Sequence, residues 1–158
     1  MSLTPCIWCN HNAVEMAHFY AGIFPNSRVL TETAAPGDNP STKQGEPLMV
    51  DVELDGLRMT LLNGGPQFPH TEAFSLTFPC ASQAEADRYY DALIADGGEP
   101  GRCGWLKDKF GFSWQVFPAA MGQYLGGADA DGAARAMQAM LSMDRIDLEE
   151  LRRAYEGK

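Results

Sequence analysis

Cysteine and histidine are the residue types best suited to metal or redox chemistry, and two of the four cysteines in this sequence lie close together. Cys6 and Cys9 have the Cys-x-x-Cys spacing of half a zinc knuckle or of a redox dithiol, and Cys9 precedes a predicted helix, where a thiolate would be stabilised. No second Cys-x-x-Cys follows, because Cys80 and Cys103 stand alone. Residues three apart on a strand face opposite sides, so two small buried hydrophobic residues are the favoured interpretation.

The histidines are His11, His18 and His70. They do not have the spacing of a metal motif such as two histidines four residues apart on a helix. We therefore favour surface or capping roles for them over metal ligation. A role as an acid or base stays open if the fold brings one of them to a pocket.

Aromatic and hydroxyl side chains indicate a second kind of site, a pocket for a small molecule. Trp8 and Trp105 suit a cleft for a flat or apolar ligand, and they suit core packing equally well. Ser75 and Thr77 place two hydroxyls on one face of a predicted strand. If that face lines a pocket, the hydroxyls orient a ligand; otherwise they need partners of their own.

The elements that position these residues follow from the spacing of apolar residues. The Asp55-Gly56 pair predicts a two-residue hairpin turn. Residues 33–47 predict a long mobile loop, either a lid over a site or a solvated insertion. Strands are predicted over residues 4–9, 28–32, 48–54, 57–63, 73–78, 101–106 and 112–117.

Two predicted helices show that the chain contains an internal repeat. Asn12 with Glu15 and Ser82 with Glu85 are capping boxes at equivalent positions, and the aromatic pairs 19–20 and 89–90 keep the same 70-residue offset. The predicted fold class is therefore α+β, with tandem βαβββ modules over about 4–66 and 72–118 that form a curved mixed sheet around a pocket.

The C-terminal residues, 119–158, differ from this repeat. They lack a strand pattern and predict a helical extension, with one helix in 128–143 and another that begins at Asp147. Methionine-rich faces pack adaptably, so this extension suits docking either on its own chain or on a partner subunit.

Several segments now identify a resemblance. Asp108, Gly111 and Gln115 have the spacing of the closing strand of the glyoxalase / bleomycin-resistance / extradiol-dioxygenase (vicinal oxygen chelate) superfamily, although Gln115 stands where that pattern has a metal-binding Glu. Phe-Pro-Asn-Ser, Leu-Asp-Gly and Leu-Asn-Gly-Gly-Pro in the first half, with Cys-Gly-Trp-Leu-Lys-Asp-Lys-Phe-Gly and Met-Gln-Ala-Met-Leu in the second, resemble the PhnB-like branch, often labelled 3-demethylubiquinone-9 3-methyltransferase. The resemblance implies paired βαβββ modules, a pocket and a homodimer.

The resemblance also implies where a metal would lie. Superfamily enzymes hold a divalent metal as a Lewis acid, with Mn, Fe, Ni or Zn suited to such ligands. The ligand candidates here are Asn63, Glu72 and Gln115. Two neutral amides and one carboxylate favour no tightly bound catalytic metal.

Three functions stay open at this point. The favoured one is a pocket that binds a small organic molecule without metal chemistry; the others are a metal-dependent lyase, isomerase or dioxygenase, and a structural role with the sheet plugged by its own side chains. Methyl transfer is not predicted, because the glycines of Asn63–Pro66 do not open a helix. The candidate pocket residues are Trp8, Asn63, Glu72, Ser75, Thr77, Trp105 and Gln115.

The composition and net charge of the chain disfavour some classes of binding partner. The chain has 158 residues, 45% hydrophobic, and a net charge of -9, which disfavours nucleic acid and anionic membranes as partners. No apolar run approaches the roughly 20 residues that span a bilayer. Four cysteines without a visible export signal predict reduced thiols in the cytoplasm.

Overall fold

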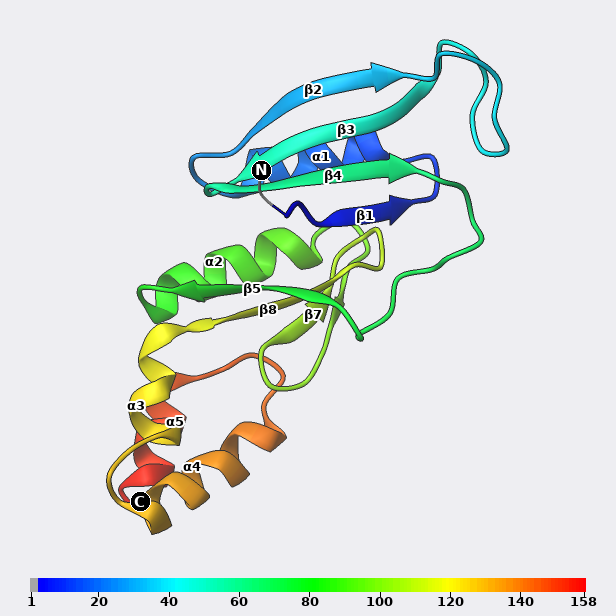
Figure 1. Cartoon of the computed structure of the whole chain (residues 1–158). Helices are drawn as coiled ribbons and strands as arrows, with labels where there is room; N and C mark the ends of the chain where they lie inside the picture. Colours follow the sequence, from blue (N-terminus) through cyan, green and yellow to red (C-terminus); the bar gives the residue numbers. More distant parts are fainter. Residues whose placement is uncertain (1–2) are drawn as a thin grey trace. The chain divides into compact units, whose positions relative to one another are not determined.

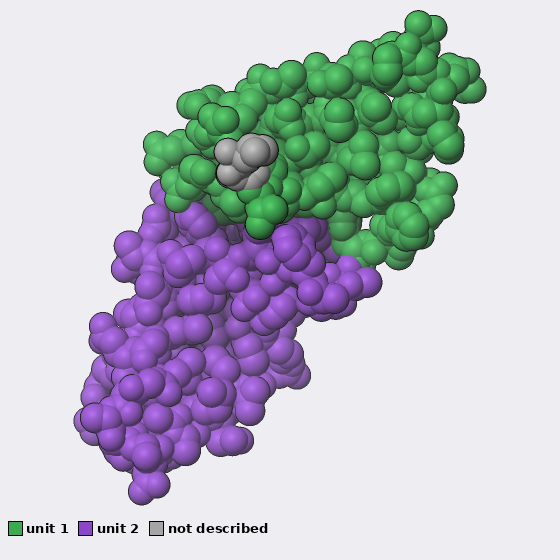
Figure 2. All heavy atoms as spheres, in the orientation of Figure 1, with its two compact units in different colours: residues 1–70 green, residues 71–158 purple. Residues whose placement is uncertain are grey.

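The computed structural model describes residues 3–158, which form two compact units. The first unit runs to His70, and the second comprises Thr71–Lys158 (Figure 2). Each unit contains one four-stranded sheet and is described below by itself. No helix within residues 3–158 is long and apolar enough to cross a membrane.

The first unit is one βαβββ module (Figure 1). Its sheet has the order β1-β4-β3-β2, in which β1 and β4 are parallel and the other neighbours are antiparallel. Its elements are β1 (Cys6–Cys9), α1 (Ala13–Ile23), β2 (Arg28–Ala34), β3 (Pro47–Leu54) and β4 (Leu57–Asn63).

The second unit repeats this order. Its sheet, β5-β8-β7-β6, pairs β5 with β8 in parallel and the other neighbours in antiparallel. The elements are β5 (Ser75–Cys80), α2 (Gln83–Ile94), β6 (Glu99–Pro100), β7 (Trp105–Lys107) and β8 (Ser113–Pro118). The predicted tandem repeat is confirmed. Neither sheet closes on itself, so enclosure of a pocket is not a property of either sheet alone.

Each helix covers one face of its own sheet. In the first unit α1 buries Met16, Ala17 and Tyr20 completely. In the second unit α2 buries Tyr89, Tyr90 and Leu93 on the side of the sheet that carries Leu106, Trp114 and Val116. Because side chains alternate along a strand, the residues between these buried positions lie on the opposite face.

The two helices begin differently, which corrects one prediction. The Ser82 hydroxyl accepts a hydrogen bond from the Glu85 backbone N–H at 3.2 Å, as predicted. Asn12 precedes α1, but its side chain makes no capping bond, since its φ of -118° and ψ of 17° are not those of an extended N-cap. The Ala13 N–H instead donates to Asn63 Oδ1 at 2.9 Å.

Cys9 and Cys80 occupy equivalent places at the ends of β1 and β5. Each thiol donates to the carbonyl two residues earlier, at 3.7 Å for Cys9 and 3.6 Å for Cys80. Burial raises the pKa of Cys9 to about 12 and that of Cys80 to about 11. Cys9 is therefore the predicted small hydrophobic residue. Cys6 is exposed, so burial was wrongly predicted for that member of the pair.

Two connections in the first unit were predicted as turns or loops. Asp55 and Gly56 take φ values of 44° and 86°, which is the type I′ geometry expected of a two-residue hairpin. The connection from β2 to β3 is irregular and shorter than predicted, because β2 extends to Ala34. Its centre is ordered by Asn39, whose Oδ1 accepts from the backbone N–H groups of Ser41 and Thr42 at 3.0 Å each.

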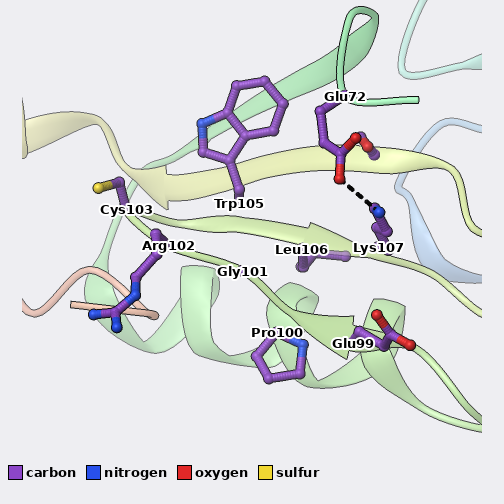
Figure 3. Close-up of a pocket in the computed structure, with 10 residues that line it drawn as sticks. Glu72, Glu99, Pro100, Gly101, Arg102, Cys103, Trp105, Leu106 and Lys107 are labelled. Carbon is purple, nitrogen blue, oxygen red and sulfur yellow. Dashed lines mark ion pairs between the residues drawn. The ribbon is translucent and has the colours of Figure 1, made fainter. Parts of the chain in front are cut away.

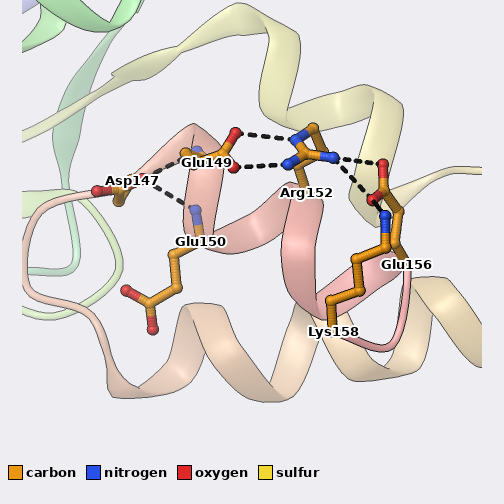
Figure 4. A network of polar contacts seen from close by, with 6 residues as sticks. All are labelled: Asp147, Glu149, Glu150, Arg152, Glu156 and Lys158. Carbon is orange, nitrogen blue, oxygen red and sulfur yellow. Dashed lines mark hydrogen bonds and ion pairs between the residues drawn. The ribbon is translucent and has the colours of Figure 1, made fainter.

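The C-terminal helices pack within the second unit. They are a short 3₁₀ helix (Ala119–Met121), α3 (Gly122–Leu125), α4 (Ala130–Ser142) and α5 (Leu148–Tyr155). Ala136, Met143, Ile146 and Leu151 form their buried core. Asp147 Oδ1 accepts from Glu149 and Glu150 N–H at 2.8 and 2.9 Å, and α5 carries further ion pairs along its exposed side (Figure 4). The predicted cap at Asp147 is confirmed.

The connection from α4 to α5 ties the extension to its own chain. Gln83 of α2 donates to the Ile146 carbonyl at 2.8 Å and accepts from the Leu148 N–H at 2.9 Å. The Arg145 guanidinium lies 4.5 Å from the centre of the Tyr90 ring and pairs with Asp91. Of the two docking modes predicted for the extension, the structure has the one on the same chain.

A buried carboxylate holds the turn that precedes β8. Asp108 is 2% exposed and accepts from the N–H groups of Phe110 and Phe112 at 2.9 and 3.1 Å, and from Trp114 Nε1 at 2.8 Å. Gly111 has a positive φ of 78°, which glycine adopts without steric cost. The Asp108 side chain thus fixes both the turn and the Trp114 ring beneath α2.

We expect the Asp108–Trp114 contact to be measurable by a double-mutant cycle. Asp108→Asn places an amide donor against the indole N–H and should lower the free energy of unfolding by about 2 kcal/mol. In the Trp114→Phe background the opposing donor is gone, so the same substitution should cost less. Urea denaturation measures both values. Equal costs in the two backgrounds would show that the indole bond contributes nothing.

Candidate functional site

The face of the second sheet that α2 leaves uncovered carries polar side chains in two rows. One row crosses three strands, because Thr77 and Trp105 both pair with Gln115. Residues paired across neighbouring strands lie on the same face of a sheet. Three predicted pocket residues are therefore brought together on this face, and Ser75 lies on it two residues before Thr77.

The second row lies one step along the strands. Ser113 pairs with both Ser75 and Lys107, and Lys107 pairs in turn with Glu99 on the edge strand. Two hydroxyls, an ammonium and a carboxylate thus follow one another across the sheet. Of these four residues, the sequence analysis had nominated Ser75 alone.

A cavity of about 490 Å³ lies where these rows reach β6 and β7. It is lined by Glu72, Glu99, Pro100, Gly101, Arg102, Cys103, Trp105, Leu106, Lys107 and Ser113 (Figure 3). The Trp105 indole gives the cavity a flat apolar wall of the kind that small-molecule sites use. Two of the predicted pocket residues, Glu72 and Trp105, lie in it.

Glu72 and Lys107 form an ion pair in this cavity. Lys107 Nζ lies 2.6 Å from Glu72 Oε1, and the two side chains are 36% and 63% exposed. Their hydrogen bond lowers the pKa of Glu72 and raises that of Lys107. Both groups are therefore charged at neutral pH.

Ser113 is the one cavity residue with a buried polar atom that lacks a partner within residues 3–158. It is 1% exposed, and its Oγ makes no hydrogen bond there. An unsatisfied buried hydroxyl costs about 1–3 kcal/mol. A bound molecule or an ordered water supplies the partner of such a group.

The side chain of Gln115 is hydrogen-bonded to Ser75 on the neighbouring strand β5. Its Nε2 donates to Ser75 Oγ at 2.9 Å, a bond that links β8 to β5 on the uncovered face. Thr77, on the same face, is exposed. These side chains form a polar floor beside the cavity.

The remaining two candidates, Trp8 and Asn63, belong to the first unit, where both have structural contacts. Trp8 Nε1 donates to the Gly65 carbonyl at 2.7 Å, and a Cβ on Gly64 would lie 2.2 Å from the Trp8 ring. Asn63 is 5% exposed, accepts from Ala13 N–H and donates from Nδ2 to the Pro47 carbonyl at 2.9 Å. The Gly-Gly segment thus accommodates a tryptophan.

Two of the three candidate metal ligands, Asn63 and Glu72, already have partners at their oxygen atoms. Within residues 3–158 no group of three or more His, Cys, Asp or Glu side chains is placed to hold an ion. Glu72 pairs with Lys107, and both ends of the Asn63 amide are used. Gln115 donates from Nε2 to Ser75, a bond that engages its nitrogen and not its oxygen. His11 and His18 are exposed, in agreement with the surface roles predicted for them.

A second cavity, of about 430 Å³, lies in the first unit and contains none of the predicted residues. Within it Thr60 Oγ1 donates to Asp51 Oδ1 at 2.6 Å, so its most polar pair is satisfied internally. Its lining residues are Thr4, Leu30, Thr31, Asp51, Arg58, Met59 and Thr60. The cavity of the second unit, with its unsatisfied hydroxyl, is the stronger candidate site.

We expect Asn63 to behave as a structural residue. Asn63→Ala removes the partners of the Ala13 N–H and of the Pro47 carbonyl, and should lower the free energy of unfolding by about 2 kcal/mol. Gln44→Ala, which truncates an exposed loop amide, should change it by less than about 0.5 kcal/mol. Thermal or urea unfolding compares them. Similar small effects for both variants would refute the structural role.

Comparison with known proteins identifies a family and several solved structures that resemble this chain. The family model described as 3-demethylubiquinone-9 3-methyltransferase matches residues 1–117. The Bacillus cereus PhnB protein is 25% identical, with a TM-score of 0.64 over 73% of this chain and 97% of its own. No curated protein matches the chain.

Two further solved structures share the fold. Protein PA1353 from Pseudomonas aeruginosa is 20% identical, with a TM-score of 0.58 over 72% of this chain and 94% of its own. The fosfomycin resistance protein FosX from Listeria monocytogenes, solved with Mn(II) and sulfate, is 12% identical, with a TM-score of 0.55 over 80% and 95%. The predicted resemblance to the PhnB-like branch is confirmed. The chain belongs to the 3-demethylubiquinone-9 3-methyltransferase family.

Proposed function

We propose that this protein binds a small organic molecule in the cavity of its second unit, without a tightly bound catalytic metal. The observation that carries the proposal is the cavity of about 490 Å³ beside Trp105, in which the buried Ser113 hydroxyl has no partner within residues 3–158. A cleft of this volume with an aromatic wall and a few polar groups is typical of small-molecule sites.

The donor atoms of two candidate ligands already have partners, which supports a site without a catalytic metal. Asn63 Oδ1 accepts from the Ala13 N–H at 2.9 Å and the Glu72 carboxylate lies 2.6 Å from an ammonium, so neither of these two groups is preorganised to bind a cation. Metal sites instead orient their ligands through surrounding hydrogen bonds that leave the binding atoms free. The Lys107 ammonium in the same cavity would in addition repel a divalent ion.

A metal-dependent lyase, isomerase or dioxygenase is the alternative, and the Mn(II) in the FosX structure is the observation that favours it. That likeness extends to the fold alone, at 12% identity. Methyl transfer has less support than either function. The glycines after β4 lead into a turn at Pro66–Gln67 instead of a helix, so they do not form a methyl-donor loop.

Dimerisation is part of the same proposal, as the family resemblance implies. Met137 and Leu141 lie four residues apart on α4 and are 39% and 52% exposed, which gives the helix an apolar strip. The cytoplasmic location predicted from the unpaired cysteines stays a prediction.

We expect protein purified without chelator to contain far less than one equivalent of Mn, Fe, Ni or Zn by elemental analysis. A thermal-shift screen of small aromatic carboxylates, amides and amines should find stabilising compounds, because a ligand of the folded state raises the midpoint of unfolding. EDTA should not change these shifts. Trp105→Ala should abolish them, whereas Phe68→Ala, which removes an exposed ring in the first unit, should not.

Stoichiometric metal that EDTA removes together with ligand binding would overturn this proposal in favour of the metal-dependent alternative. Shifts that persist in Trp105→Ala would place the ligand elsewhere.

A further inference from the structure

Building on the proposed function, we infer that the ligand carries a carboxylate or an equivalent oxyanion on a flat apolar body. Lys107 and Ser113 bind the oxyanion, and the Trp105 indole packs against the body. All three residues line the same cavity. The proposal concerns the chemical class of the ligand, which the fold leaves open.

A carboxylate of the protein itself, that of Glu72, already occupies the position proposed for the ligand's oxyanion. The Glu72 carboxylate lies 2.6 Å from Lys107 Nζ, so the ammonium is positioned to bind a carboxylate from this side (Figure 3). Glu72 precedes β5, which begins at Ser75, and its side chain is 63% exposed. Exposed ion pairs are weak, so a ligand that also packs against Trp105 can displace the Glu72 side chain.

Ser113 offers a second hydrogen-bonding group for the oxyanion, one that Glu72 does not contact. It is the cross-strand partner of Lys107, so the two side chains are neighbours on one face of the sheet. Its buried Oγ has no hydrogen-bond partner within residues 3–158. A hydroxyl can donate to an oxyanion that an adjacent ammonium also contacts, and charged hydrogen bonds of this kind are stronger than neutral ones.

The balance of charge in the cavity favours an anion once Glu72 is displaced. Its lining includes two carboxylates, Glu72 and Glu99, and two cations, Arg102 and Lys107. Arg102 also faces Asp144, at 3.6 Å. When the Glu72 carboxylate leaves, Lys107 loses its ion-pair partner, and an incoming anion restores the pair. A cationic ligand would instead be repelled by the ammonium.

The test uses three probes with one aromatic body: naphthalene-2-carboxylate, its carboxamide and its aminomethyl analogue. Isothermal titration of the full chain should show the carboxylate binding at least about tenfold more tightly than either of the others. Lys107→Met should weaken carboxylate binding by about tenfold or more and leave carboxamide binding unchanged. Ser113→Ala should weaken carboxylate binding by a smaller factor.

Two further variants separate this effect from loss of folding. Glu72→Gln should strengthen carboxylate binding, because it removes the internal competitor for Lys107; a misfolded protein cannot give this result. Lys43→Met is the matched control, since Lys43 pairs with Asp38 at 3.2 Å in a loop of the first unit. It should leave the affinities for all three probes unchanged.

The outcomes distinguish the two proposals. If the carboxamide or the amine binds as tightly as the carboxylate, or if Glu72→Gln and Lys107→Met leave carboxylate binding unchanged, the oxyanion class is wrong while a small-molecule pocket stands. If none of the three probes binds, the proposed function fails as well.

Discussion

The alternation of side chains along β8 is the constraint on which the second unit depends. Trp114 and Val116 are buried on the side of the sheet that α2 covers. Ser113 and Gln115 must therefore lie on the opposite face, because a strand turns successive side chains to opposite sides. The Asp108 carboxylate, bonded to the Trp114 indole at 2.8 Å, fixes this alternation at the start of the strand. A slip of one residue would bury the polar row and expose the tryptophan.

The same constraint explains why the uncovered face carries chemistry. The helix α2 packs against the other face, while the C-terminal helices pack against Phe117 at the end of β8. β7 brings Trp105 and Lys107 beside β8, and β6 adds Glu99 at the edge. The result is a cavity with one aromatic wall, one ammonium and one unsatisfied hydroxyl, all held by strands. Sites built on strands keep their geometry better than sites built on loops.

Local signals in the sequence predicted much of the fold. The Asp55-Gly56 hairpin, the Ser82 cap and the internal repeat depend on neighbouring residues, and the structure has all three. The Asn12 cap failed because its competitor, Asn63, comes from a strand far along the chain. Lys107 was not among the predicted pocket residues, because its place in a cavity depends on pairing with Ser113 and Glu99, which no local pattern encodes.

The candidate metal ligands also show that tertiary contacts cannot be predicted from residue types alone. Their residue types suggested metal ligation, but each has a partner within the protein. Asn63 accepts from the first N–H of α1, Gln115 donates to Ser75, and Glu72 pairs with Lys107. Buried amides rarely remain unpaired, so an amide candidate for ligation is always in competition with the backbone and with its neighbours. That competition is settled by tertiary contacts.

The central claim is that the protein binds no catalytic metal through Asn63, whose amide is hydrogen-bonded at both ends, or through Gln115, which donates to Ser75. The most direct measurement follows the side-chain amide signals of Asn63 and Gln115 by NMR while Mn²⁺ is added, since a bound paramagnetic ion broadens nearby protons. The account predicts that both signals persist at equimolar Mn²⁺ with no more broadening than the exposed amide of Gln44. Selective loss of the Asn63 or Gln115 signal would contradict it.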